Sequence, residues 1–370
     1  ARYGLTVDDA QMIITAGRQE VQAAITQAAQ GLPAHPANPV HAGMLISASP
    51  SGIALTAGDG DVIFTAQLDV IPEVPGKVIL PGRMLADISG YFTGEEVSID
   101  CSGSRAEIIS GRSRFSLSLA PGDQYPSWDI PGETGLITVD AQSFAAAVKQ
   151  VSPAASRTSA VLRTIRLTPG DGKLFLAATN HSALGVTSLG EGVPDYPPAL
   201  VPVSVMERFA RVVPEGDLSL GWDDSLISMS VPGLQVISRQ VQGKYPEWQK
   251  ITAQEPGLSA TVNVKEMAKA VRMASVVAGV DRIEFCFAGG GMMTVRAQGS
   301  SGSSQEEIPS GYEGDAALFL LGAQLVLEGL AGCPGETVQL KFTEPRKAVY
   351  FRDGTYVWMM ESYIAADNRL

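Results

Sequence analysis

The sequence predicts an α+β protein made of three tandem domains of one design. Its 370 residues are enough for two or three ordinary domains, and a pattern of helix, strands, helix and strands recurs along it. Hydrophobic residues make up 45% of the chain and charged residues 18%, which is typical of domains with buried cores. We expect domains at residues 1–131, 132–256 and 257–370.

Markers repeated at a domain-sized spacing support this division. The motif Tyr-Pro-x-Trp occurs at residues 125–128 and 245–248, a separation of 245 − 125 = 120 residues. A Thr-Val-Asx triplet occurs at residues 6–8, 138–140 and 261–263, and its Asx residue is suited to cap a following helix. The first helix of each domain is therefore expected to begin near Asp8, Asp140 and Asn263.

A second helical segment in each domain precedes a turn and a strand. The turns begin at Gly94, Gly216 and Gly335, and the helices before them are expected to begin near Gly82, Ser204 and Gly322. Runs of strand character with Gly, Asp and Asn turns lie between the two helices, at residues 53–64, 162–186 and 283–295. Pro and Gly residues at 131–135 and 255–257 are suited to linkers.

Four further motifs occur in register with the repeat: residues 112–117 leading to Tyr125-Pro126, residues 178–180, residues 243–246 and residues 356–359. Together they resemble the β subunit of bacterial DNA polymerase III, the DNA sliding clamp family, over essentially the whole chain. The resemblance implies that each domain has two helices inside a ring and β-sheets outside. Two chains would join head to tail, so that each supplies half of a six-domain ring.

The resemblance also implies a processivity factor for DNA replication. A homodimer would encircle double-stranded DNA without sequence specificity. It would tether the DNA polymerase III catalytic subunit, the clamp loader and other proteins with a clamp-binding motif. No enzymatic activity, cofactor or metal is implied. Three cysteines far apart without a CxxC pair predict reduced thiols in a cytoplasmic protein, and we expect neither secretion nor a membrane span.

The net charge of −12 argues against nucleic acid unless the 27 basic residues gather on one surface. Lys265, Lys269 and Arg272 follow i, i+4 and i+7 spacing on one predicted helix, so they form a basic stripe. His35 matches a position where the family often has a DNA-contacting Arg. The DNA-binding candidates are Arg18, His35, Arg83, Lys149, Arg208, Arg211, Lys265, Lys269 and Arg272. Ordinary solvated helix faces remain the alternative.

The family has an apolar peptide pocket between its second and third domains. The matching residues here are Leu162, Thr179, Leu184, Pro246, Lys250, Ile251, Val357, Trp358 and Met359. Taken singly, the apolar ones are equally suited to a core. At the rim, Ala183 stands where the family usually has a basic residue, and the chain runs on after Ser362 to Leu370.

Ring closure in the family joins an edge strand of the first domain to the third domain of the other subunit. The matching residues are Phe115, Leu117, Val276 and Val277. Residues 114–119 alternate between polar and apolar, as expected for a half-buried edge strand. A strand paired within the chain would show the same alternation.

The sequence contains no clear motif for catalysis. His35, His41 and His181 belong to no metal-spaced pair or triad, and the Gly-rich turns contain no phosphate-binding pattern. Two alternatives from other classes remain: a clamp-like partner-binding protein that no longer binds DNA, and a hydrolase with paired carboxylates. The carboxylates for the second are Asp59, Asp61, Asp223 and Asp224.

Overall fold

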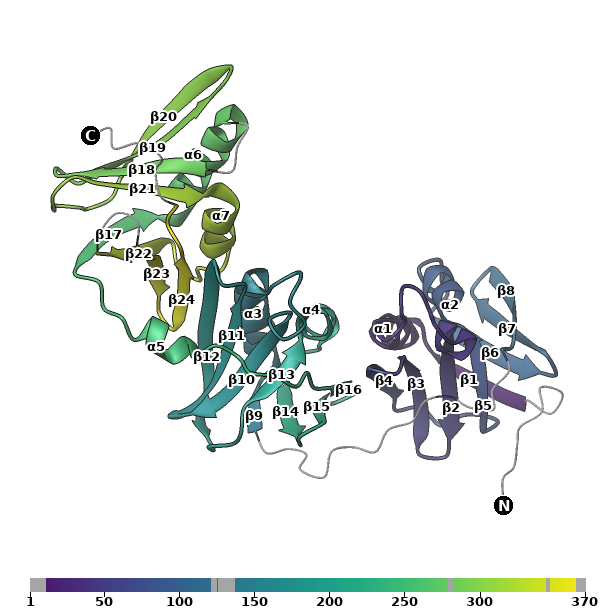
Figure 1. Ribbon diagram of the computed structural model, residues 1–370. Coiled ribbons are helices and arrows are strands. Elements are labelled where there is room, and N and C mark those ends of the chain that lie inside the picture. The colour runs from purple at the N-terminus through teal and green to yellow at the C-terminus, as the bar shows by residue number, and fades with distance from the viewer. Residues whose placement is uncertain (1–10, 121–124, 126–136, 279–281, 344–346, 364–370) are drawn as a thin grey trace. The chain divides into compact units, whose positions relative to one another are not determined.

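The computed structural model describes residues 11–120, 125, 137–278, 282–343 and 347–363 (Figure 1). The chain forms two compact units. Unit 1 contains Ala1–Ala145 with Arg208–Gln240, and unit 2 contains Ala146–Glu207 with Val241–Leu370. Among the described residues, no helix is long and apolar enough to cross a membrane.

Unit 1 contains an eight-stranded antiparallel sheet of order β5-β2-β3-β4-β16-β15-β14-β9 and a four-stranded sheet of order β1-β6-β7-β8. Its strands are β1 (Gln11–Gly17), β2 (Gly43–Ser49), β3 (Gly52–Gly58), β4 (Val62–Leu68), β5 (Gly76–Pro81), β6 (Glu96–Ser102), β7 (Arg105–Ser110), β8 (Ser113–Ser118), β9 (Ile137–Asp140), β14 (Asp217–Trp222), β15 (Leu226–Val231) and β16 (Leu234–Arg239). Its helices are α1 (Arg18–Ala29), α2 (Gly82–Ser89) and the 3-10 helix η2 (Pro39–Ala42).

Unit 2 repeats this plan, with an eight-stranded sheet of order β13-β10-β11-β12-β24-β23-β22-β17 and a four-stranded sheet of order β20-β19-β18-β21. Its strands are β10 (Thr164–Gly170), β11 (Gly172–Thr179), β12 (Ala183–Val193), β13 (Ala199–Pro202), β17 (Leu258–Asn263), β18 (Arg282–Ala288), β19 (Met292–Gly299), β20 (Gly302–Pro309), β21 (Ala317–Gly322), β22 (Thr337–Phe342), β23 (Val349–Asp353) and β24 (Tyr356–Met360). Its helices are η3 (Ser152–Ala154), α5 (Trp248–Thr252), α6 (Val264–Ala278) and α7 (Ala323–Ala331), while α3 (Ala141–Val151) and α4 (Val203–Val212) contribute residues to both units.

The threefold repeat is visible residue by residue. Gly17, Asp140 and Asn263 each end a strand, pair with a strand that follows the second helix, and directly precede a helix. Their spacings are 140 − 17 = 123 and 263 − 140 = 123 residues. Asp140 Oδ1 accepts the backbone N–H of Ser143 at 2.7 Å, and Asn263 Oδ1 accepts that of Lys265 at 3.0 Å. These two residues are therefore the helix caps that the sequence predicts.

The predicted start of the first helix is wrong. Asp8 lies outside the described residues, but Gln11–Gly17 is a strand and the helix begins only at Arg18. Gly17 has no side chain with which to cap the helix, and Thr15-Ala16-Gly17 stands directly before this helix where the other two repeats have Thr-Val-Asx. The other five predicted helix starts are confirmed to within about one residue, which is the usual uncertainty of helix ends.

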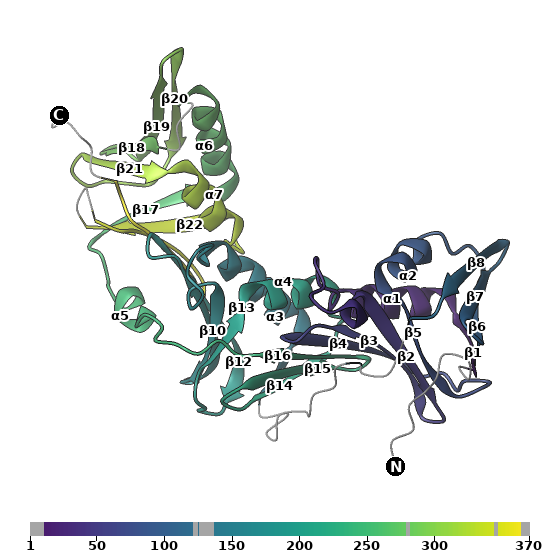
Figure 2. The same ribbon diagram turned by 45° about the vertical axis from the view of Figure 1, so that its right-hand side comes forward.

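The helices bury one face against the sheets. In α1 the buried residues Val21, Ala24, Ile25 and Ala28 follow the i, i+3, i+4, i+7 spacing of an amphipathic helix. Within unit 1, α1 and α2 lie side by side, and within unit 2 so do α6 and α7 (Figures 1 and 2). The polar faces of these helices are consequently turned away from the sheets.

Candidate functional site

Several predicted DNA-binding residues of unit 1 already have structural partners. Arg18 donates from Nε to the Gly94 carbonyl at 2.8 Å, and Arg83 donates from Nη2 to the Pro33 carbonyl at 2.7 Å. His35 is exposed in the loop before η2. The two guanidinium groups therefore help hold loops in place as well as carrying positive charge.

Of these residues, Arg208 is the most strongly held by contacts within the chain. Its Nη1 donates to the Gln30 carbonyl at 2.7 Å, and its guanidinium lies 5.8 Å from the centroid of the Phe64 ring. Burial lowers the pKa of Arg208 below its ordinary value. The neighbouring Arg211 is exposed and reaches Gln30 Oε1 at 3.5 Å. Arg208 thus closes the C-terminal end of α1, where a cation is favourable.

The predicted DNA-binding residues of unit 2 have no such partners among the described residues. Lys265, Lys269 and Arg272 are exposed on one face of α6, while Met267 and Val271 are buried on the other. Lys149 is exposed on α3. Within the described part of the chain, none of these four cations forms an ion pair or a side-chain hydrogen bond. Their charge remains available to an external anion.

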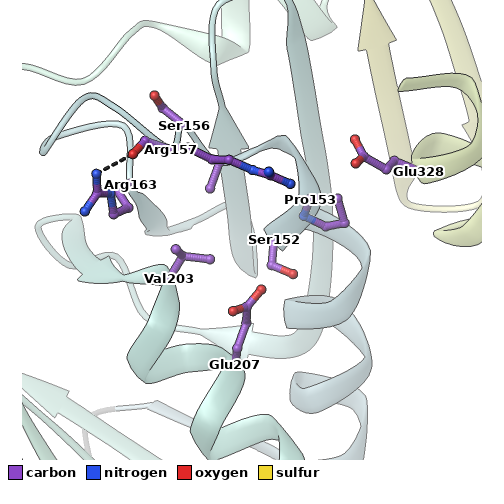
Figure 3. Close-up of a pocket in the computed structure, with 9 residues that line it drawn as sticks. Ser152, Pro153, Ser156, Arg157, Arg163, Val203, Glu207 and Glu328 are labelled. Atoms are coloured by element: carbon purple, nitrogen blue, oxygen red, sulfur yellow. Dashed lines mark hydrogen bonds between the residues drawn. The ribbon is translucent and has the colours of Figure 1, made fainter. Parts of the chain in front are cut away.

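Two arginines that the sequence analysis did not single out lie beside a cavity of about 400 Å³ in unit 2 (Figure 3). Arg163 donates from Nη2 to the Arg157 carbonyl, and the Arg157 side chain extends toward Pro153. Glu207 and Glu328 supply carboxylates to the same cavity. These arginines lie in a loop without helical periodicity, so no sequence pattern marks them.

Most of the predicted pocket residues gather on one face of the eight-stranded sheet of unit 2. We call this the outer face, since helix α7 packs against the other face. Leu162, Leu184 and Met359 are buried in one apolar cluster, against which Ile251 and Val357 pack while partly exposed. The strand register places Leu184 opposite Met359 and Val186 opposite Val357, across the β12–β24 pairing. Residues distant in sequence thus form one apolar surface.

The remaining predicted pocket residues have different positions. Thr179 donates from its hydroxyl to the Ala183 carbonyl at 2.7 Å and so closes the β11–β12 turn. Lys250 is exposed and paired with Glu247, and Pro246 is half-buried. Trp358 is fully buried on the opposite face of its strand.

Trp358 supports helix α7 from below. A Cβ atom on Gly329 would lie 2.5 Å from the indole, so only glycine allows α7 to approach this closely. Successive side chains of a strand point to opposite faces. Trp358 therefore cannot line the surface formed by its neighbours Val357 and Met359.

A segment before and within α5 covers the apolar surface. The Trp248 ring centroid lies 5.5 Å from that of Phe175, and Tyr245 donates from its hydroxyl to the Ala177 carbonyl at 3.3 Å. Arg166 lies 5.7 Å from the centroid of the Tyr245 ring. Burial raises the pKa of Tyr245 well above its ordinary value. Tyr245 and Trp248 belong to the repeated Tyr-Pro-x-Trp motif, which marked the repeat in the sequence but did not predict this cover.

The predicted dimer residues lie at two sheet edges. Strand β8 is an edge strand with Leu117 buried beneath it and Phe115 half-buried. At the end of α6, Val276 is 85% exposed, and Val277 lies against Gly302 of β20, the other edge strand. Sequence reasoning missed further exposed large apolar side chains, which among the described residues are Ile71, Met84, Tyr91, Met273, Met292 and Tyr363.

Comparison with known proteins shows a likeness to bacterial sliding clamps. The model described as DNA polymerase III beta subunit, N-terminal domain, matches residues 12–131. The "Beta sliding clamp" of Streptomyces coelicolor is 29% identical over 350 residues, which cover 91% of this chain and 92% of the relative. The crystal structure of the DNA polymerase III beta subunit from Thermotoga maritima has a TM-score of 0.89 at 17% identity, covering 96% of this chain and all of that one.

Residues 12–131 match the family model, and the chain as a whole is similar to beta sliding clamps. The "Beta sliding clamp homolog GriR" of Streptomyces muensis is also similar, at 25% identity over 88% of this chain and 90% of the relative. The resemblance and the α+β clamp fold expected from the sequence are therefore confirmed.

Beta sliding clamps are processivity factors without enzymatic activity, which removes the hydrolase alternative. The carboxylates considered for it have a structural role in two hairpin turns. Asp59 Oδ1 accepts the backbone N–H of Asp61 at 2.8 Å, and Asp223 Oδ1 accepts that of Ser225 at 2.7 Å. Among the described residues, no group of three or more His, Cys, Asp or Glu side chains is placed to hold a metal ion.

Proposed function

We propose that this chain is a DNA sliding clamp that encircles double-stranded DNA as a head-to-tail homodimer. It would tether the replicative polymerase, the clamp loader and other partners through the apolar outer surface of unit 2. In this proposal residues 1–131, 132–256 and 257–370 are three equivalent domains with eight strands each. The pairing of the fourth and eighth strands carries the proposal.

The fourth strand of one domain pairs with the eighth strand of the next. Strand β4 pairs with β16, and β12 pairs with β24, each in antiparallel register. By the same rule β20 should pair with the eighth strand of a following domain, and β8 should pair with the fourth strand of a preceding domain. Both are edge strands in this chain. A second copy of the chain would supply each missing neighbour, so that neither β8 nor β20 is left as an open edge.

The helix ends carry matching side chains for this contact. Within unit 1, Gln27 donates from Nε2 to the Val212 carbonyl at 3.4 Å, so the end of α1 contacts the end of α4. The repeat of 123 residues makes Met273 the equivalent of Gln27, since 27 + 123 + 123 = 273. Glu96 and Asp217 occupy equivalent positions in β6 and β14, which are 217 − 96 = 121 residues apart. Tyr91 is therefore the equivalent of Val212, since 212 − 121 = 91.

Both equivalents at the expected dimer contact are apolar and exposed, with Tyr91 at 71% and Met273 at 45%. Val276, one helical turn further along α6, is 85% exposed. Exposed apolar side chains at the ends of helices in both units are suited to an interface between two copies. Association of two copies would remove them from water.

Replacing Val276 by Lys tests the dimer. The side chain is already exposed, so the folded chain should tolerate the charge, whereas burial at the interface should not. We expect the wild type to have about twice the 38.8 kDa chain mass by light scattering at micromolar concentration and Val276→Lys to be monomeric. Ile71→Lys, at a position 78% exposed in unit 1, is the control and should stay dimeric. A monomeric or trimeric wild type would contradict the proposed ring.

The basic stripe of α6 is the proposed main contact with DNA. Free cations on a helix touch phosphates without reading bases, which permits sliding. Changing Lys265, Lys269 and Arg272 together to Glu should abolish stable loading onto circular DNA. The salt dependence of duplex binding should fall by about one unit for each lost phosphate contact.

A triple variant with the same charge change elsewhere is the control for this experiment. Lys77, Lys173 and Lys244 are exposed and lie outside the helices. Their replacement by Glu should leave loading and the salt slope close to the wild type. Equal losses in both triple variants would assign the effect to total charge. Normal loading and an unchanged salt slope in a folded, dimeric α6 variant would mean that the stripe is only a solvated helix face, and a wild type that does not load would support the partner-binding alternative without DNA.

A further inference from the structure

The apolar surface proposed for partner peptides is not empty in this chain. Trp248 is only 5% exposed and belongs to the same buried cluster as Leu162, Leu184 and Met359. Its ring packs on Phe175, which projects from β11. An indole of the chain itself therefore fills part of the surface.

This burial has an unfavourable component. Trp248 Nε1 is inaccessible to water and has no hydrogen-bond acceptor among the described residues. A buried N–H without a partner loses the hydrogen bonds that water would give it. Movement of the indole toward solvent would restore them, so the apolar contacts alone hold the ring in place.

The backbone is anchored on both sides of Trp248, but the indole itself is held by packing alone. Helix α5 is a single turn of five residues, and Glu247 at its N-cap makes no side-chain capping bond. Its C-terminal side is held by Arg352, which donates from Nη2 to the carbonyls of Thr252 and Gln254 at 2.8 Å each. On the N-terminal side Tyr245 is hydrogen-bonded to the Ala177 carbonyl, so the indole can leave by rotation of its own side chain while both anchors stay intact.

We propose that Trp248 is an internal ligand of the peptide surface, and that a partner peptide binds by displacing its indole. The inference rests on the proposed peptide-binding function of unit 2. An apolar side chain of the partner replaces the ring on Phe175 and Leu184. The apparent affinity for peptide is then reduced by the fraction of molecules in which Trp248 is bound.

Calorimetry with a tryptophan-free clamp-binding peptide from a replicative polymerase separates an internal ligand from a wall of the site. If Trp248 competes, Trp248→Ala should bind the peptide about fivefold or more tightly than the wild type. If Trp248 is part of the wall, Trp248→Ala should bind more weakly, which would overturn the inference. Leu184→Asp, which places a charge in the surface, should bind at least about tenfold more weakly in either case.

Tryptophan fluorescence of the wild type provides a readout that does not depend on the folding of Trp248→Ala. Displacement should expose the indole and shift the emission to longer wavelength during peptide titration. Trp248→Phe should remove that shift, whereas Trp222→Phe, a substitution in the core of unit 1, should retain it. Binding without a shift overturns the displacement and leaves the peptide site standing. Absence of peptide binding in the wild type and in Trp248→Ala overturns both the displacement of Trp248 and the proposed peptide site.

Discussion

The outer faces of the two eight-stranded sheets have the same backbone pairing and opposite chemistry. In unit 1 three central positions of this face are polar, and in unit 2 the three equivalent positions are apolar. The equivalent pairs are Thr56 and Ala177, Thr65 and Val186, and Gln235 and Val357. One sheet can thus face water, while the other requires a cover.

The covers differ accordingly. In unit 1 the hydroxyls of Thr56 and Thr65 lie 3.2 Å apart and are half-buried, so they need no protein partner above them. In unit 2 Tyr245 and Trp248 pack over Ala177 and Phe175. Under the proposed function, side-chain chemistry, and not the path of the backbone, would decide which of the two sheets accepts a peptide.

The largest expected effect comes from giving unit 2 the side chains of unit 1. Val186→Thr combined with Val357→Gln places two unpaired polar groups beneath a bound apolar side chain, with a penalty of about 2 kcal/mol, or about 30-fold in affinity. Calorimetry with the polymerase peptide should show this loss. The reverse pair in unit 1, Thr65→Val with Gln235→Val, is the control and should leave peptide affinity unchanged.

An equal loss in both double variants would mean that peptide binding depends on general stability. Retained affinity in Val186→Thr with Val357→Gln would mean that the peptide binds away from this face. Circular dichroism melting of each variant separates these outcomes from unfolding.

The sequence predicted most of the fold because each domain repeats its local signals. Asp140 and Asn263 mark helix starts through a side-chain cap, and the prediction failed only where Gly17 has no cap to show. Which face a strand residue occupies was less predictable. Trp358 matched a family position, but the alternation of β24 turns its side chain to the core.

The sequence also did not show which cations are hydrogen-bonded within the chain. Arg18, Arg83 and Arg208 donate to backbone carbonyls far away along the chain, and every residue type carries such a carbonyl. The stripe on α6 was predictable because its spacing and its buried opposite face both follow the helical period.

A smaller effect is expected at Arg166, the equivalent of Leu45 in unit 1. Arg166 Nε is buried without a hydrogen-bond acceptor among the described residues, and burial lowers the pKa of the guanidinium. Replacing a half-buried charge by an apolar side chain is often stabilising, although the contact with Tyr245 is lost. We expect Arg166→Leu to raise the melting temperature by about 2 °C, measured by calorimetry.

Arg166→Gln serves as the matched control, because it removes the charge but keeps a polar group at the same place. Arg166→Gln should not show the rise in melting temperature expected for Arg166→Leu. A fall in stability of Arg166→Leu by more than about 1 kcal/mol would show that the cation–π contact outweighs the burial cost. The positive charge beside Tyr245 would then be part of what holds the cover in place.

The smallest expected effect is at Thr56, on the face that needs no cover. Thr56→Val keeps the β-branched shape that suits a strand and removes one hydroxyl. The partner hydroxyl of Thr65 is half-buried and can turn to water, so the free energy of unfolding should change by less than about 0.5 kcal/mol. Urea unfolding measures this change, and peptide affinity should be unaltered. A loss above about 1.5 kcal/mol would mean that the hydroxyl pair itself holds this sheet together. In that case the polar side chains of unit 1 would be structural, and the contrast with unit 2 would concern strand pairing as well as the acceptance of a partner.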